Sequence, residues 1–220
     1  MASIFISWET TLCIHPTSMA RDGLKKGLVL QESLGFNPMK FGLMASTDTH
    51  NANPGDTEEW DYRGANSYMG SPAKNRLQDG IREPKVVNPG GLAAVWAREN
   101  TRDALFDAMS RREVYATSGT RLALRFFAGA DLPEDLVKTG DISAAYASGV
   151  PMGGTIDADA GVPRLFIWAT QDPDNAPLAK IQIIKGWLED GETHEKVFDV
   201  ACSDKKTDGA CIAANAPVDL

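Results

Sequence analysis

Asp48 and His50 are the residues whose types and spacing best fit metal chemistry in this sequence. One residue separates them, and in extended backbone such a pair projects to the same side of the chain. A carboxylate and an imidazole form a ligand pair suited to Zn²⁺, Mn²⁺ or Fe²⁺. We therefore expect Asp48 and His50 to converge on one divalent ion, although an Asp and a His at this spacing also occur together by chance.

The segment before this pair is expected to be a buried strand that positions it. Residues 40–46, KFGLMAS, form a short apolar run of strand length after an Asn-Pro turn signal. Ligands gather at the carboxyl ends of strands in β/α folds, which is where the pair would then lie. Residues 51–89 follow, rich in Asn, Gly, Pro and charged side chains, and indicate a long irregular loop of the kind that often carries function.

Four further polar residues are candidates for supporting the site or touching a substrate: Asn51, Glu59, Arg112 and Arg121. Acidic residues in polar loops are more often solvated than bound to an ion, which is the plainer interpretation of Glu59. The guanidinium groups of Arg112 and Arg121 suit recognition of phosphate or carboxylate. Arginine near a helix C-terminus is also favoured by the helix dipole alone, so both interpretations of the arginines stay open.

Two helices are predicted ahead of the β-rich half of the chain. Residues 18–34 have leucines at near-helical spacing, with Ser18 as the expected N-cap and a glycine directly after the last leucine. Two internal glycines lower the helix propensity of this segment. A second helix is expected over residues 101–112, with Asn100 as its cap and arginines in its last turn.

The chain after about residue 119 changes from helical to alternating patterning, which predicts antiparallel strands. An Asp190-Gly191 pair between two long alternating runs predicts a type I′ hairpin. The predicted fold class is therefore α/β, a strand–helix portion followed by a β-rich, sandwich-like antiparallel module. The expected strands cover residues 113–117, 121–126, 164–170, 178–188 and 193–201.

Longer motifs resemble one family, the PHP-related group known as domain of unknown function 3604 (DUF-3604). They are STDTHN at 46–51, GLAAVWARENTRDALFDAMSRREVYATSGTR at 91–121 and RFFAG at 125–129. The resemblance implies that Asp48 and His50 are metal ligands in a distorted β/α barrel of the PHP (polymerase and histidinol phosphatase) metallohydrolase type. Full members are longer and supply the first metal ligands from an H-x-H motif, which this sequence lacks.

The resemblance and the patterning together predict three parts: an unassigned segment over residues 1–17, the C-terminal part of a PHP-like metal-binding domain over 18–119, and the β-rich module over 120–220. The implied function is a portion of a bacterial divalent-metal-dependent hydrolase. Its substrate would be a small molecule, and phosphoesters follow only by analogy with the superfamily. The alternative is a noncatalytic β-rich binding or structural module with a vestigial metal site, and the choice between enzyme and module stays open.

Composition narrows the partners and leaves the compartment open. With 22 basic and 30 acidic residues, the net charge of −8 disfavours nucleic acid as a partner. The apolar stretches are shorter than the ~20 residues that a membrane span needs, and the first residues do not resemble a signal peptide. Cys202 and Cys211 lie close together in sequence, so a bridge between them is sterically easy if the compartment is oxidising, as an extracytoplasmic one would be.

Overall fold

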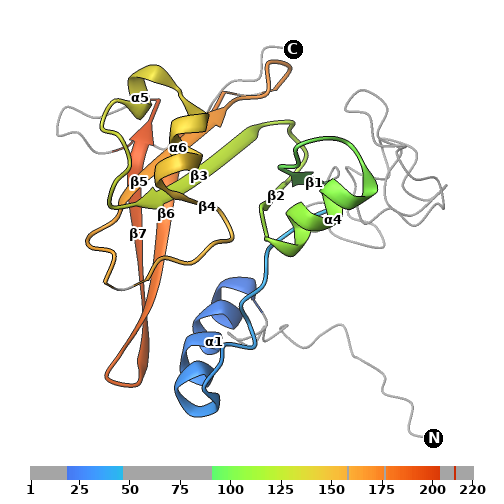
Figure 1. Ribbon diagram of the computed structural model, residues 1–220. Helices are drawn as coiled ribbons and strands as arrows, with labels where there is room; N and C mark the ends of the chain where they lie inside the picture. Colours follow the sequence, from blue (N-terminus) through green and yellow to red (C-terminus); the bar gives the residue numbers. More distant parts are fainter. Residues whose placement is uncertain (1–18, 47–90, 158, 176, 204–210, 212–220) are drawn as a thin grey trace, which may run out of the picture. The chain divides into compact units, whose positions relative to one another are not determined.

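The computed structural model describes residues 19–46, 91–157, 159–175, 177–203 and 211 (Figure 1). The described residues fall in two compact units. One unit combines the first helix with the last two strands, and the other contains all the elements between them. The chain of the second unit therefore interrupts that of the first. The division predicted near residue 119 followed secondary-structure content and stays a prediction.

The first helix, α1, spans Ala20–Leu34 and packs its own glycines against the segment that follows it. It ends at Gly35, whose φ of 79° gives the left-handed cap expected there. A β-carbon at Gly27 would lie 2.7 Å from the Met39 β-carbon and would also overlap the Asn37 side chain. Glycine at this helical position is therefore required by the close crossing of the chain. The N-cap position is Met19, and Ser18 lies outside the described residues.

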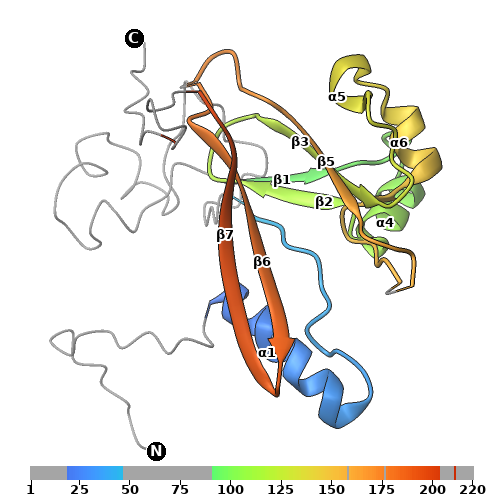
Figure 2. The ribbon, with the colours of Figure 1, turned by 90° about the vertical axis from the view of Figure 1, so that its left-hand side faces the viewer.

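The C-terminal hairpin consists of β6, Lys180–Glu189, and β7, Glu192–Cys202 (Figure 2). Asp190 and Gly191, with φ angles of 51° and 77°, form the tip. Positive φ at both central residues is the signature of a type I′ turn, so the hairpin predicted from the Asp-Gly pair is confirmed. The register shifts once, between Ile181 and Gln182.

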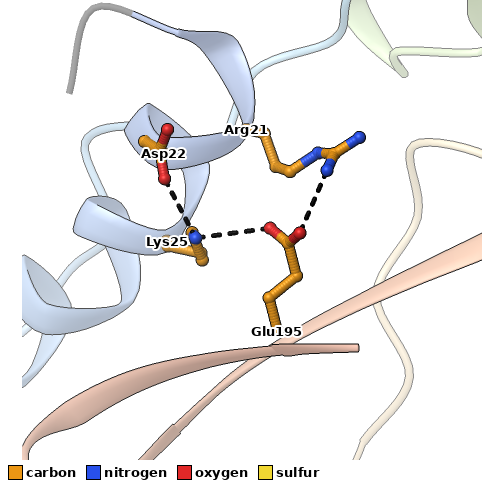
Figure 3. A network of polar contacts seen from close by, with 4 residues as sticks. All are labelled: Arg21, Asp22, Lys25 and Glu195. Carbon is orange, nitrogen blue, oxygen red and sulfur yellow. Dashed lines mark hydrogen bonds and ion pairs between the residues drawn. The ribbon is translucent and has the colours of Figure 1, made fainter. Parts of the chain in front are cut away.

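Helix α1 is joined to the hairpin by a network of charged side chains (Figure 3). Glu195 accepts from Arg21 Nη1 at 3.0 Å and pairs with Lys25 Nζ at 3.3 Å, while Lys25 also meets Asp22 at 2.9 Å. The hydrogen bonds to Asp22 and then to Glu195 raise the pKa of Lys25. A β-carbon at Gly186 would lie 3.3 Å from the Lys25 side chain, so α1 covers the hairpin face that carries Gly186 and Glu195.

The second unit begins with a small two-stranded sheet. Strands β1, Leu92–Val95, and β2, Val114–Thr117, pair antiparallel although helix α4, Arg102–Ser110, connects them. Thr101 caps α4 by accepting a hydrogen bond from the Ala104 amide at 3.3 Å. The cap was predicted one residue earlier, at Asn100. The helix also ends before the arginines that were placed in its last turn.

A three-stranded sheet and two short helices form the apolar core of this unit (Figure 1). The strand order is β4-β3-β5, with β3 at Ala123–Gly129, β4 at Val150–Pro151 and β5 at Arg164–Thr170. Helices α5, Leu136–Thr139, and α6, Ile142–Ser148, pack on the sheet face that carries Phe127 and Phe166. The buried cluster consists of Phe127, Leu132, Leu136, Ala145 and Phe166.

The fold is mixed, with helices and small antiparallel sheets, and it differs from the expected architecture in two ways. Every strand pair in the part of the chain described is antiparallel, and its sheets do not close into a barrel. The alternation β1–α4–β2 predicted a parallel β/α unit, but the chain reverses through α4 and makes a hairpin-like pair. The sandwich-like module is also not formed by the described strands, because β3–β5 are covered by α5 and α6, two helices that the alternating pattern did not predict.

The expected buried strand over residues 40–46 is wrong. This segment has no regular secondary structure, and Phe41, Leu43 and Met44 are each more than two-fifths exposed. Apolar composition alone predicted burial on both faces. A strand also needs a neighbour that accepts its backbone hydrogen bonds, and none of the described strands pairs with this segment.

Candidate functional site

The predicted metal ligands are not covered by the description of the structure. Asp48, His50, Asn51 and Glu59 all lie in the stretch outside the described residues. The convergence of Asp48 and His50 therefore stays a prediction. The remaining candidates, Arg112 and Arg121, are described and can be placed.

The segment that leads to Asp48 runs alongside β2. A β-carbon at Gly42 would lie 3.1 Å from Val114 Cγ2, near the start of β2. Farther on, a β-carbon at Gly91 would lie 2.7 Å from the Thr117 carbonyl oxygen and 3.0 Å from that of Ser46. The segment therefore follows the direction of β2 and reaches its carboxyl end at Ser46. Gly91 lets three backbone segments meet there, because any side chain would displace one of them.

Arg112 occupies a backbone position that usually belongs to glycine. Its φ is 61°, and it directly follows the end of α4. The Arg112 amide donates to Met109 O at 2.9 Å and the Glu113 amide donates to Ala108 O at 3.0 Å, the pattern of a Schellman cap. The Arg112 side chain donates from Nε to Gly153 O at 2.9 Å. Arg112 thus ties the end of α4 to the turn after β4.

Arg121 lies beyond the carboxyl end of β2, next to a buried carboxylate. Its backbone amide donates to Asp172 Oδ2 at 2.7 Å, and Asp172 is 3% exposed. Asp172 also accepts from the Asp174 amide at 3.1 Å and from the Asn175 side chain at 2.9 Å. The turn over residues 172–175 was predicted from its Asp-Pro-Asp-Asn sequence. Asp172 uses this turn to hold the connection between β2 and β3.

A second polar cluster, which sequence reasoning missed, lies between β2, β3 and α6. Arg125 donates from Nη1 to the Tyr146 hydroxyl at 3.0 Å, and that hydroxyl donates to Oε1 of Glu113. Glu113 is 5% exposed, and its other oxygen lies 3.5 Å from Arg111 Nη2. The Arg125 guanidinium stacks 3.6 Å from the centroid of Trp96. A buried carboxylate is thus connected through a phenol to an arginine held by an aromatic ring.

The electrostatics of this cluster keep the Tyr146 phenol neutral. Burial, followed by the hydrogen bond to Glu113, raises the pKa of Tyr146. Burial likewise raises the pKa of Tyr115, whose hydroxyl donates to the Leu122 carbonyl at 3.0 Å. No short motif would have indicated the cluster, because Glu113 and Tyr146 are 33 residues apart in sequence.

Cys202 and Cys211 lie at disulfide-bonding distance, with their α-carbons 5.7 Å apart. This separation is typical of a disulfide, so the proximity predicted from the sequence is confirmed. The bridge would join the last residue of β7 to Cys211. Neither cysteine is then available as a metal ligand.

Metal-ligating side chains do not gather elsewhere in the described part of the chain. Residues 19–46, 91–157, 159–175, 177–203 and 211 contain no group of three or more His, Cys, Asp or Glu side chains placed to hold an ion. None of the helices in these ranges is long and apolar enough to cross a bilayer.

Comparisons with known proteins give one match. The model of a family described as "Protein of unknown function (DUF3604)" matches residues 3–220. No curated protein and no solved structure matches the chain.

Proposed function

The chain belongs to the DUF3604 family, and we propose that it is a portion of a divalent-metal-dependent hydrolase related to the PHP superfamily. The observation that carries the proposal is the Asp48-Thr49-His50 motif, which combines a carboxylate and an imidazole at a spacing suited to one ion. It lies within the region that the family model matches. Asp48 and His50 would each supply one ligand atom.

The path of the preceding segment supports this proposal. Ser46 lies at the carboxyl end of β2, and the two residues from Ser46 to Asp48 span at most about 7 Å. Arg121 follows the same end of β2 in the chain. It is therefore the arginine we assign to an anionic group of the substrate, because a guanidinium binds phosphate or carboxylate with two parallel hydrogen bonds.

A bound Zn²⁺, Mn²⁺ or Fe²⁺ would supply an activated water and stabilise negative charge on the attacked group. The residues of this chain would hold the ion and orient the substrate. Arg112 would act at a distance, since its strained backbone and its hydrogen bond to Gly153 fix the start of β2. Phosphoesters are the substrate class we propose to test first.

Calorimetric titration of the chain with Zn²⁺ and Mn²⁺, with a chelator control, tests the ligands. Two protein ligands leave most of a four- to six-coordinate shell to water, so we expect weak binding that Asp48→Ala and His50→Ala each lower further. His194→Ala is the matched control, because His194 stacks on Trp187 in the hairpin with ring centroids 5.4 Å apart. Unchanged metal binding in His50→Ala would contradict the metal assignment.

A longer version of the protein that includes an H-x-H segment tests the hydrolase assignment. We expect it to bind metal tightly and to hydrolyse model phosphoesters, with most activity lost in Asp48→Ala and in His50→Ala. Arg121→Ala should raise KM more than it lowers kcat, because a substrate-binding arginine acts in the ground state as well as in the transition state. If the longer protein binds no metal, a noncatalytic binding module becomes the better description of the chain.

A further inference from the structure

The β6–β7 hairpin has an outer face, opposite to the one that α1 covers. Side chains alternate along a strand, so the neighbours of Gly186 and Glu195 point away from α1. Cross-strand pairing then places four pairs on the outer face. From the middle of the hairpin to its tip they are Ile183 with Phe198, Lys185 with Lys196, Trp187 with His194, and Glu189 with Glu192.

The ring and cation contacts confirm that these side chains share a face. Trp187 stacks on His194 with an interplanar angle of 24°. Lys185 Nζ lies 5.0 Å from the Trp187 ring centroid, and Lys196 Nζ lies 4.9 Å from that of Phe198. The outer face is thus an ordered series of an apolar pair, a basic pair, an aromatic pair and an acidic pair.

Two of the four pairs place like charges directly opposite each other. Lys185 faces Lys196, and Glu189 faces Glu192, and all four side chains are exposed. Such pairs destabilise a sheet, because opposed side chains stand only about 5 Å apart at their β-carbons. The lysines separate by bending toward different rings, which lessens their repulsion. The hairpin alone offers neither pair a partner of opposite charge on this face.

We propose that the outer face binds the outer face of a second copy of this chain. A two-fold axis across the strands, at the level of Trp187 and His194, reverses the order of the pairs. Successive pairs on one face are about 6.8 Å apart, and the acidic and basic pairs lie one step on either side of the aromatic pair. Each acidic pair then faces the basic pair of the other copy.

The contacts across this interface follow from the symmetry. Strand β6 faces β6 and β7 faces β7, so Glu189 meets Lys185 of the second copy and Glu192 meets Lys196 of the second copy. The aromatic pairs meet at the centre, where buried aromatic side chains contribute most. All four like-charge oppositions in the two hairpins gain oppositely charged neighbours. A polyanion fits this face less well, since the acidic pair lies beside the basic one.

The dimer should be weak and sensitive to salt. A face two strands wide buries much less than the roughly 1,600 Å² of a standard interface. Exposed charge pairs are also screened as ionic strength rises. Sedimentation velocity of the full chain at low ionic strength should therefore show a concentration-dependent dimer that dissociates in high salt. A chain that remains monomeric at millimolar concentration in low salt would overturn the proposal, which is independent of the hydrolase assignment.

Two charge-reversal variants make the test specific. The acidic variant carries Lys185→Glu and Lys196→Glu, and the basic variant carries Glu189→Lys and Glu192→Lys. Each outer face then has one sign of charge, and we expect the dissociation constant of each homodimer to rise at least about tenfold, because like charges face each other across the interface. An equimolar mixture should form a heterodimer, because the two altered faces are complementary.

The mixture also separates the proposal from a loss of folding and from binding of a polyanion. Circular dichroism checks that each variant retains the native content of strand. A heterodimer formed by two variants that do not dimerise alone would support the face-to-face arrangement. Homodimers of unchanged affinity, or a mixture that stays monomeric although both variants are folded, would overturn it. Combining all four substitutions in one chain should restore the homodimer.

Discussion

The two units of this chain bury different kinds of residue. In the described part of the chain, every buried hydrophobic side chain belongs to the unit that contains β1–β5: Ala108, Val114, Phe127, Leu132, Leu136, Ala145 and Phe166. The unit of α1 and the hairpin buries two glycines in α1, and its partners are joined by ion pairs around Glu195 and by the Cys202–Cys211 contact.

This difference predicts different sensitivities. A core of packed side chains loses stability when volume is removed, because the cavity that remains is only partly filled by relaxation. A helix held by close backbone approach loses stability when volume is added. The comparison between the units can therefore be tested by substitutions of opposite kinds.

Removal of the Phe127 side chain should have the largest effect. Phe127 is 1% exposed and contacts Tyr146 edge-on, with ring centroids 4.9 Å apart. We expect Phe127→Ala to lower the free energy of unfolding by about 3–5 kcal/mol, measured by urea denaturation. Leu165→Ala is the control, because Leu165 lies on the neighbouring strand and is 48% exposed. Equal costs for the two variants would refute the core assignment.

Loss of the Cys202–Cys211 bridge should rank second and should act on the hairpin. The two cysteines are 9 residues apart, and closing a loop of that size stabilises a fold by roughly 2–3 kcal/mol in the chain-entropy model. Cys202→Ser should therefore lower hairpin stability in oxidising buffer, as followed by hydrogen exchange of β6 and β7. In the presence of dithiothreitol the native chain and the variant should behave alike. A difference that persists under reduction would point to a packing role instead.

The two glycines of α1 should respond in opposite directions. Gly27→Ala places a methyl group against Met39 and Asn37, and overpacking of this kind costs about 1–3 kcal/mol. Gly23→Ala meets only the flexible end of Met39 at 3.4 Å, so the gain in helix propensity, up to about 1 kcal/mol, should dominate. Thermal denaturation of both variants checks the prediction. Stabilisation by both substitutions would show that the crossing at Gly27 can relax.

The smallest effect should appear only at alkaline pH. The pKa of Tyr146 is raised in the folded chain by burial and by Glu113, so the folded state holds the phenol proton longer than the unfolded state does. The resulting stabilisation is present below about pH 10 and is lost as pH rises through the folded pKa. Tyr146→Phe should remove this alkaline loss, and Glu113→Gln should lower the pKa of Tyr146. Ultraviolet titration of the phenol measures both.

Local features of the fold could be predicted from the sequence. The strand Arg164–Thr170 and the turn at Asp190-Gly191 are found as expected, because alternation and turn chemistry act over a few neighbouring residues. Helices α5 and α6 were missed, since each is shorter than the windows in which helical spacing can be recognised. In α6 the signal was the cap, because Asp141 accepts a hydrogen bond from the Ala144 amide at 3.1 Å.

Features that depend on distant partners could not be predicted. The apolar run over residues 40–46 has the composition of a buried strand, but its sequence does not say whether another strand pairs with it. Likewise, nothing in the spacing of Glu113, Arg125 and Tyr146 indicated that their side chains would meet. The candidate metal ligands were chosen by residue type and resemblance, and the convergence of Asp48 and His50 stays a prediction.

The interruption of one unit by the other sets the order in which the chain can be completed on the ribosome. Arg21 and Glu195 are 174 residues apart, and at about 5–20 residues per second roughly 9–35 s of synthesis separate them. Helix α1, with 15 residues, is of marginal length for a helix in water without its packing partners. The intervening unit emerges first and can fold while α1 waits, so the docking of α1 on the hairpin is one of the last events of translation.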